Sequence, residues 1–90
     1  MPYLNERERK GIDPYVDPLV AWVRQAKLLP GGLNYIVTRI AQAYLGDDPR
    51  YLRYNDVIGA LEAAKLEMYR RAAGPYEDKK AKENGDVWRV

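Results

Sequence analysis

The sequence LNYIVTRIAQAYL, residues 33–45, decides the fold class because its apolar residues recur with the spacing of an α-helix. Seven of them share one face of such a helix, namely Leu33, Ile36, Val37, Ile40, Ala41, Tyr44 and Leu45. Gly46 follows directly, at a position where glycine commonly ends a helix. The segment therefore predicts an amphipathic helix over residues 33–45.

A helix is predicted on each side of this segment. Asp13-Pro14 and Asp17-Pro18 each set an acidic N-cap residue before a proline, which is typical of a helix start. We expect an N-terminal arm over residues 1–12, helices over 13–29, 33–45 and 49–73, and a tail over 75–90. Gly74-Pro75 is expected to end the third helix, because proline cannot continue one. These elements predict an all-α fold in one domain, a compact three-helix domain with a short C-terminal helical tail.

Two features within these elements leave alternatives open. Gly59 lies inside the third helix, where glycine costs about 1 kcal/mol relative to alanine, so it either allows close helix packing or opens the backbone to a ligand. Trp88 lies in an apolar C-terminus, which is typical of an anchor within the subunit or against a neighbour. A chain of this length buries only roughly two-thirds of its unfolded surface, so we also expect a homo-oligomer.

The composition excludes several classes of chemistry. The 90 residues contain no Cys, no His and no Ser, which removes thiolate, imidazole and serine catalysis and Cys/His zinc sites. Carboxylates that could hold Mg²⁺, at Asp47-Asp48, Glu62 and Glu77-Asp78, also suit helix caps and dipole partners. We therefore expect a protein that is not an enzyme and that has no catalytic residue, no metal and no cofactor.

The charges and the apolar runs restrict the partners. The formal net charge is +2 and the two signs are interspersed, so a duplex DNA surface is not expected. No apolar run approaches the roughly 18 residues of a membrane span, and we expect a cytoplasmic protein without a membrane partner.

Tyrosine and arginine supply the candidate ligand-binding residues. The chain has eight Tyr and no Phe, and several of the Tyr lie close to Arg in the sequence. Aromatic rings stack on nucleobases and guanidinium groups bind phosphates, so this pairing suits a small nucleotide. The predicted binding residues are Asn34, Tyr35, Thr38, Arg39, Tyr69, Arg70, Arg71, Tyr76, Lys79 and Asn84.

Several of these residues also have a structural interpretation. The Tyr rings could line helix edges or a subunit interface. Arg70 and Arg71 could complement the dipole at the end of the third helix, and Asn34 could cap the second. The sequence leaves both sets of interpretations open.

Several blocks of the sequence resemble a small family of phage and prophage proteins of unknown function. The blocks are YNDVIGALE (54–62), KLEMYRR (65–71), PYEDKK (75–80) and ENGDV (83–87), and NYIVTR (34–39) and the opening MPY (1–3) are also similar. The chain departs from the pattern at Pro18 and at the terminal Trp88-Arg89-Val90.

The resemblance implies a phage protein in the bacterial host cytoplasm but supplies no established activity. Small oligomeric phage proteins include sponges that sequester the nucleotide signals of bacterial anti-phage defence. We expect such a non-catalytic sponge, with a small nucleotide as ligand. A module that inhibits a host protein is the alternative, and a nucleic-acid-binding protein is a weaker one.

Overall fold

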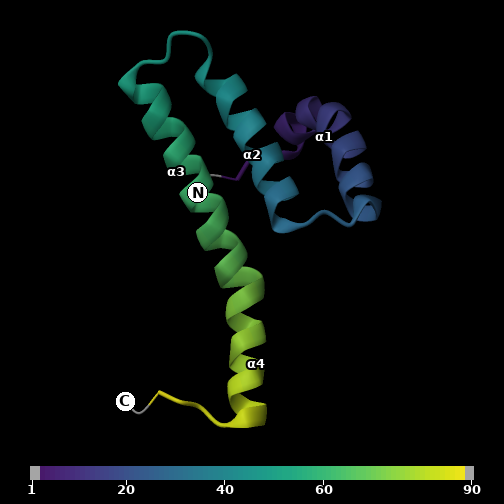
Figure 1. Cartoon of the computed structure of the whole chain (residues 1–90), viewed down its shortest axis with the longest axis vertical. Helices are drawn as coiled ribbons and strands as arrows, with labels where there is room; N and C mark the ends of the chain where they lie inside the picture. The colour runs from purple at the N-terminus through teal and green to yellow at the C-terminus, as the bar shows by residue number, and fades with distance from the viewer. Residues whose placement is uncertain (1–2, 89–90) are drawn as a thin grey trace. The chain divides into compact units, whose positions relative to one another are not determined.

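The computed structural model of this chain describes residues 3–88 (Figure 1). The elements are α1 (Glu6–Ala26), α2 (Pro30–Leu45), α3 (Tyr51–Met68), the π-helical segment η1 (Tyr69–Ala73) and α4 (Gly74–Asn84). No strand occurs in residues 3–88, which confirms the predicted all-α class. The elements form two units, one with α1 and α2 and the other with α3, η1 and α4. The single-domain interpretation stays a prediction.

Helix α1 begins at Glu6, so the predicted N-terminal arm over residues 1–12 is wrong from that residue onward. The Asn5 side chain accepts a hydrogen bond from the Glu8 N–H at 2.8 Å, and the Glu8 carboxylate accepts one from the Asn5 N–H at 3.1 Å. This reciprocal capping box satisfies two backbone donors and starts the helix without help from apolar packing. The helix ends at Ala26 rather than at residue 29, because Lys27 turns into the left-handed region with φ 51°.

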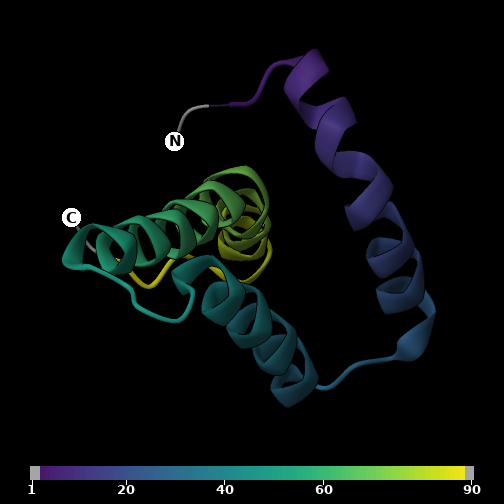
Figure 2. The ribbon, with the colours of Figure 1, turned by 90° about the horizontal axis from the view of Figure 1, so that it is seen from above.

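Two prolines that were expected to start α1 lie inside it. Helix α1 is drawn as one continuous ribbon (Figure 2), and its residues include Pro14 and Pro18. Neither proline has an N–H, so the carbonyls of Lys10 and Pro14 lose the helical donor four residues later. The helix therefore tolerates two missing hydrogen bonds on one side.

Helix α2 ends at the residue that the apolar repeat predicts, but it starts three residues earlier than residue 33. It begins at Pro30, in the first helical position where the missing N–H costs nothing, with Leu29 as its N-cap residue. It ends at Leu45 as predicted, and the Gly46 N–H donates to the Gln42 carbonyl at 3.1 Å. Within the apolar face, Ile36 and Val37 are half-buried.

Helices α3 and α4 join through η1 into 34 consecutive helical residues, drawn from green to yellow in Figure 1. The prediction that Gly74-Pro75 ends the third helix is therefore wrong. The Gly74 N–H donates to the Tyr69 carbonyl, five residues back, which makes this turn wider than an α-helical turn. Pro75 then stands in the first turn of α4, where proline is tolerated.

The helices expose their apolar side chains. None of the residues 3–88 is buried, and the exposed large side chains include Ile40 of α2 and Ile58 and Met68 of α3. At the C-terminus Val87 and Trp88 are 86% and 79% exposed, so the predicted anchor is not packed within the described residues; Arg89 and Val90 lie outside them. No helix of residues 3–88 has the length and apolar character that a membrane span requires.

Candidate functional site

The predicted binding residues fall into two groups on separate units. Asn34, Tyr35, Thr38 and Arg39 lie on α2 and are called the α2 strip below. The others lie on η1 and α4, namely Tyr69, Arg70, Arg71, Tyr76, Lys79 and Asn84.

The α2 strip places an aromatic ring beside a guanidinium group. Tyr35 and Arg39 are four residues apart and therefore share a helix face. Arg39 donates a hydrogen bond from Nη1 to the Tyr35 hydroxyl at 3.1 Å, and its guanidinium carbon lies 5.8 Å from the ring centroid. The Tyr35 side chain is 61% exposed, so the ring is accessible to a flat ligand.

Asn34 and Thr38 form the second row of the α2 strip. The Thr38 hydroxyl donates to the Asn34 carbonyl at 2.8 Å and lies 3.4 Å from the Asn34 side-chain oxygen. Because its proton is used within the helix, Thr38 offers a ligand an acceptor, whereas the Asn34 amide offers two donors. Asn34 is the fifth residue of α2, so the capping role considered for it is wrong.

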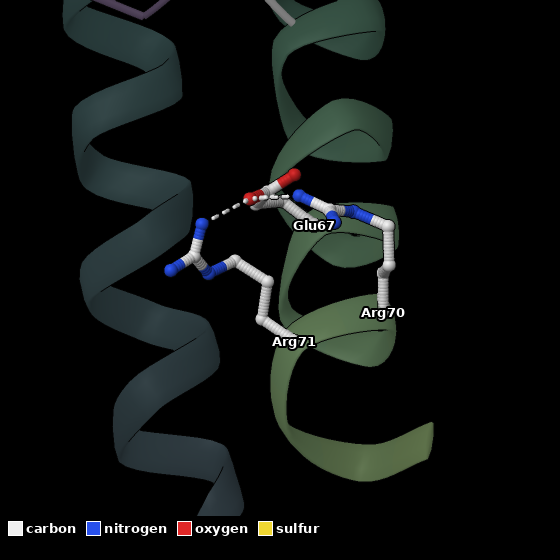
Figure 3. A network of polar contacts seen from close by, with 3 residues as sticks. All are labelled: Glu67, Arg70 and Arg71. Carbon is white, nitrogen blue, oxygen red and sulfur yellow. Dashed lines mark hydrogen bonds and ion pairs between the residues drawn. The ribbon is translucent and has the colours of Figure 1, made fainter. Parts of the chain in front are cut away.

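In the second group, one carboxylate binds both arginines (Figure 3). Oε1 of Glu67 lies 2.9 Å from Nη2 of Arg70 and 3.6 Å from Nη1 of Arg71. The Glu67 side chain is 24% exposed, much less than those of either arginine. A phosphate at this place would compete with a carboxylate that is already bound. The suggested dipole role does not apply, because the helix continues to Asn84.

Tyr69 binds a carboxylate on the next element. Its hydroxyl donates to Oε2 of Glu77 at 2.9 Å. This hydrogen bond, together with the negative charge of Glu77, raises the pKa of Tyr69 above its ordinary value, with smaller contributions from desolvation and from Asp78. The phenol therefore keeps its proton to a higher pH than an ordinary tyrosine.

Tyr76 pairs with Lys80, which is not among the predicted binding residues. The ammonium nitrogen of Lys80 lies 5.7 Å from the centroid of the Tyr76 ring and 3.2 Å from Oε2 of Glu83. The signal was present, because Tyr76 and Lys80 have the same spacing of four as Tyr35 and Arg39. Lys79 and Asn84 make no side-chain hydrogen bond or ion pair with the described part of the chain.

Within the described residues, metal ligands form no cluster, and the hollow on α1 does not include a predicted binding residue. In residues 3–88 no three side chains of His, Cys, Asp or Glu gather where they could hold a metal ion. A shallow hollow on α1 is lined by Glu6, Arg7 and Lys10 and contains none of the predicted binding residues. The α2 strip is therefore the best-formed candidate site.

Comparison with known proteins gives a family match. Residues 1–87 match a family described as a domain of unknown function (DUF6899). No curated protein and no solved structure matches the chain.

Proposed function

The chain belongs to the DUF6899 family, and we propose that it is a non-catalytic binding protein that sequesters a small nucleotide signal. The observation that supports this function most directly is the exposed Tyr35 ring beside the Arg39 guanidinium on α2. The two side chains supply the two elements that a nucleotide needs, a surface for the base and a cation for the phosphate.

The geometry of the α2 strip supports a mononucleotide-sized contact. In the second row of the α2 strip, the Asn34 amide has two donors that suit acceptor atoms on a base edge. Arg39 uses one of its five N–H donors on the Tyr35 hydroxyl, so the others remain available to a phosphate. A cyclic oligonucleotide or a dinucleotide carries a base for Tyr35 and a phosphate for Arg39 in one molecule.

The chemistry of the strip supports binding rather than turnover. Its four side chains are an amide, a phenol, a hydroxyl and a guanidinium, and none of them is a general base near neutral pH. A ligand that is bound and not changed is removed from signalling, which is the action of a sponge.

The resemblance to phage and prophage proteins supports the biological setting. We place the protein in the cytoplasm of an infected bacterium, as a phage product that evades nucleotide-based immunity. Cyclic di- and trinucleotides and ADP-ribose derivatives are the ligand classes that this setting suggests.

A thermal-shift screen tests the function. The purified chain is heated with cyclic dinucleotides, cyclic trinucleotides and ADP-ribose derivatives, and with nucleoside monophosphates as controls. A ligand at 100 times its Kd adds about 2.7 kcal/mol, which raises the Tm of a domain of this size by several degrees. Recovery of the intact ligand after denaturation supports a sponge; a converted ligand contradicts it.

Matched variants locate the site. We expect Tyr35→Ala and Arg39→Ala to abolish the shift, whereas Tyr15→Ala and Arg24→Ala on α1 leave it unchanged. If Arg71→Glu abolishes the shift and Arg39→Ala does not, the ligand binds the group on η1 instead.

The exposed C-terminus supports an alternative function, the inhibition of a host protein. Val87 and Trp88 present apolar surface that a partner could bury. If no nucleotide shifts the Tm and Trp88→Ala abolishes capture of one host protein, the alternative replaces the sponge.

A further inference from the structure

Helix α3 carries a regular seam along its whole length. Residues at alternating spacings of three and four share one face, and they are Tyr51, Tyr54, Ile58, Leu61, Lys65 and Met68. This spacing is the a/d repeat of a coiled coil, in which each side chain inserts between four residues of a facing helix. The five apolar members are 46–78% exposed in the described residues, so their side chains are available to a facing helix.

We propose that the α3 seam binds the α3 seam of a second copy in antiparallel orientation, forming a two-fold symmetric homodimer. When the two α3 helices lie side by side, with the start of one beside the end of the other, all six positions of the seam face a partner. Tyr51 faces Met68 of the second copy, Tyr54 faces Lys65, and Ile58 faces Leu61; symmetry repeats each pair once.

The position of Lys65 selects the antiparallel orientation. A parallel pair would place Lys65 against Lys65 of the second copy, with two like charges inside the seam. In the antiparallel pair the ammonium meets the face of the Tyr54 ring, which attracts cations. At the ends of the seam the Met68 sulfur meets the Tyr51 ring, which is also a favourable contact.

The flanks of the α3 seam agree with this register. In the antiparallel pair Asn55 faces Glu62 of the second copy on one side, and Val57 faces Ala64 on the other. Neither side brings like charges together. Directly after Met68 the wider turn of η1 changes the spacing, so the seam ends where α3 ends.

The exposed area of the chain is large enough for this interface. The accessible surface is 8601 Å², and a standard interface takes about 800 Å² from each partner. A second copy can therefore cover the seam and leave other surface for further partners.

The oligomeric state tests the dimer, independently of any nucleotide. Light scattering of the full chain should give about twice the monomer mass of 10.4 kDa. We expect Leu61→Glu, at the centre of the seam, to give monomers, and Leu66→Glu, on another face of α3, to stay dimeric. Circular dichroism checks that both variants remain helical. A monomeric parent chain overturns the proposal, as does equal dissociation by the two variants.

Engineered cysteines test the orientation, because the chain has no Cys of its own. We expect the double variant Tyr54→Cys/Lys65→Cys to form covalent dimers with oxidised glutathione, and each single variant to form almost none. Within one helix the two positions are about 16 Å apart, too far for an internal disulfide. Efficient cross-linking of Tyr54→Cys alone indicates parallel helices and overturns the antiparallel register.

Discussion

Tyr69 and Glu77 are joined by a hydrogen bond of 2.9 Å that crosses from the π-helical segment into α4. The two residues stand on either side of Gly74 and Pro75, where the sequence predicts a helix end. The side-chain bond therefore links the two helical segments that the wide turn joins, and it raises the pKa of the Tyr69 phenol.

The pKa of Tyr69 gives the first prediction. The hydrogen bond to Glu77 and the charge of Glu77 raise this pKa above 10.0, so the folded chain holds the phenolic proton more tightly than the unfolded chain. The stabilisation is complete below pH 10 and is lost as the pH rises through the raised pKa. Tyrosinate absorbance in a pH titration should show one group that ionises later than an ordinary tyrosine.

Two variants identify that group. Tyr69→Phe should remove the late ionisation, and Glu77→Gln should move it back towards pH 10, because the amide carries no charge. A late ionisation that survives in Tyr69→Phe would assign the raised pKa to another tyrosine.

The Asn5 capping box gives the second prediction. Asn5→Ala should destabilise the start of α1 by about 1 kcal/mol, because the Glu8 N–H loses the side-chain acceptor that Asn5 supplies. Hydrogen exchange of the amides in the first turn of α1 measures the effect. Glu8→Gln keeps an acceptor and is the matched control; the box is unimportant if the control and Asn5→Ala exchange equally fast.

The prolines of α1 give the third prediction. Pro18→Ala restores an N–H donor for the Pro14 carbonyl and should stabilise α1 by up to about 3 kcal/mol, measured by urea unfolding followed by circular dichroism. Pro30→Ala is the control, because the first residue of α2 needs no donor. A loss of stability in Pro18→Ala would show that the proline shapes a contact of α1.

Periodicity in the sequence predicted α2 best, because seven apolar residues indicate its apolar face and Gly46 indicates its end. The end of α4 was also predictable, since Asn84 is its last residue and Gly85 follows with φ 88°. The start of α1 was missed because a capping box stabilises a helix without apolar periodicity. The continuity of α3 and α4 was missed because a π turn leaves no repeat in the sequence.

The candidate site was predictable where it depends on one helix. The spacing of four places Arg39 beside Tyr35 in any α-helix that includes both. The spacing of Glu67 to Arg70 and Arg71 also predicts ion pairs within one helix, although the predicted helix end suggested a dipole role for the arginines. The contact between Tyr69 and Glu77 was not predicted, because the helix end predicted at Gly74-Pro75 lies between these two residues.

Gly59 gives the last prediction and separates two interpretations of its place in α3. A Cβ atom built at Gly59 meets nothing within 4 Å, and φ is not positive, so the close packing considered for this glycine does not occur within the described residues. Gly59→Ala should therefore stabilise α3 by about 1 kcal/mol in urea unfolding. Gly74→Ala is the contrasting variant, because its Cβ would lie 3.2 Å from the Tyr69 carbonyl oxygen and should gain less. A destabilised Gly59→Ala would mean that a ligand or a second chain approaches the backbone at this point.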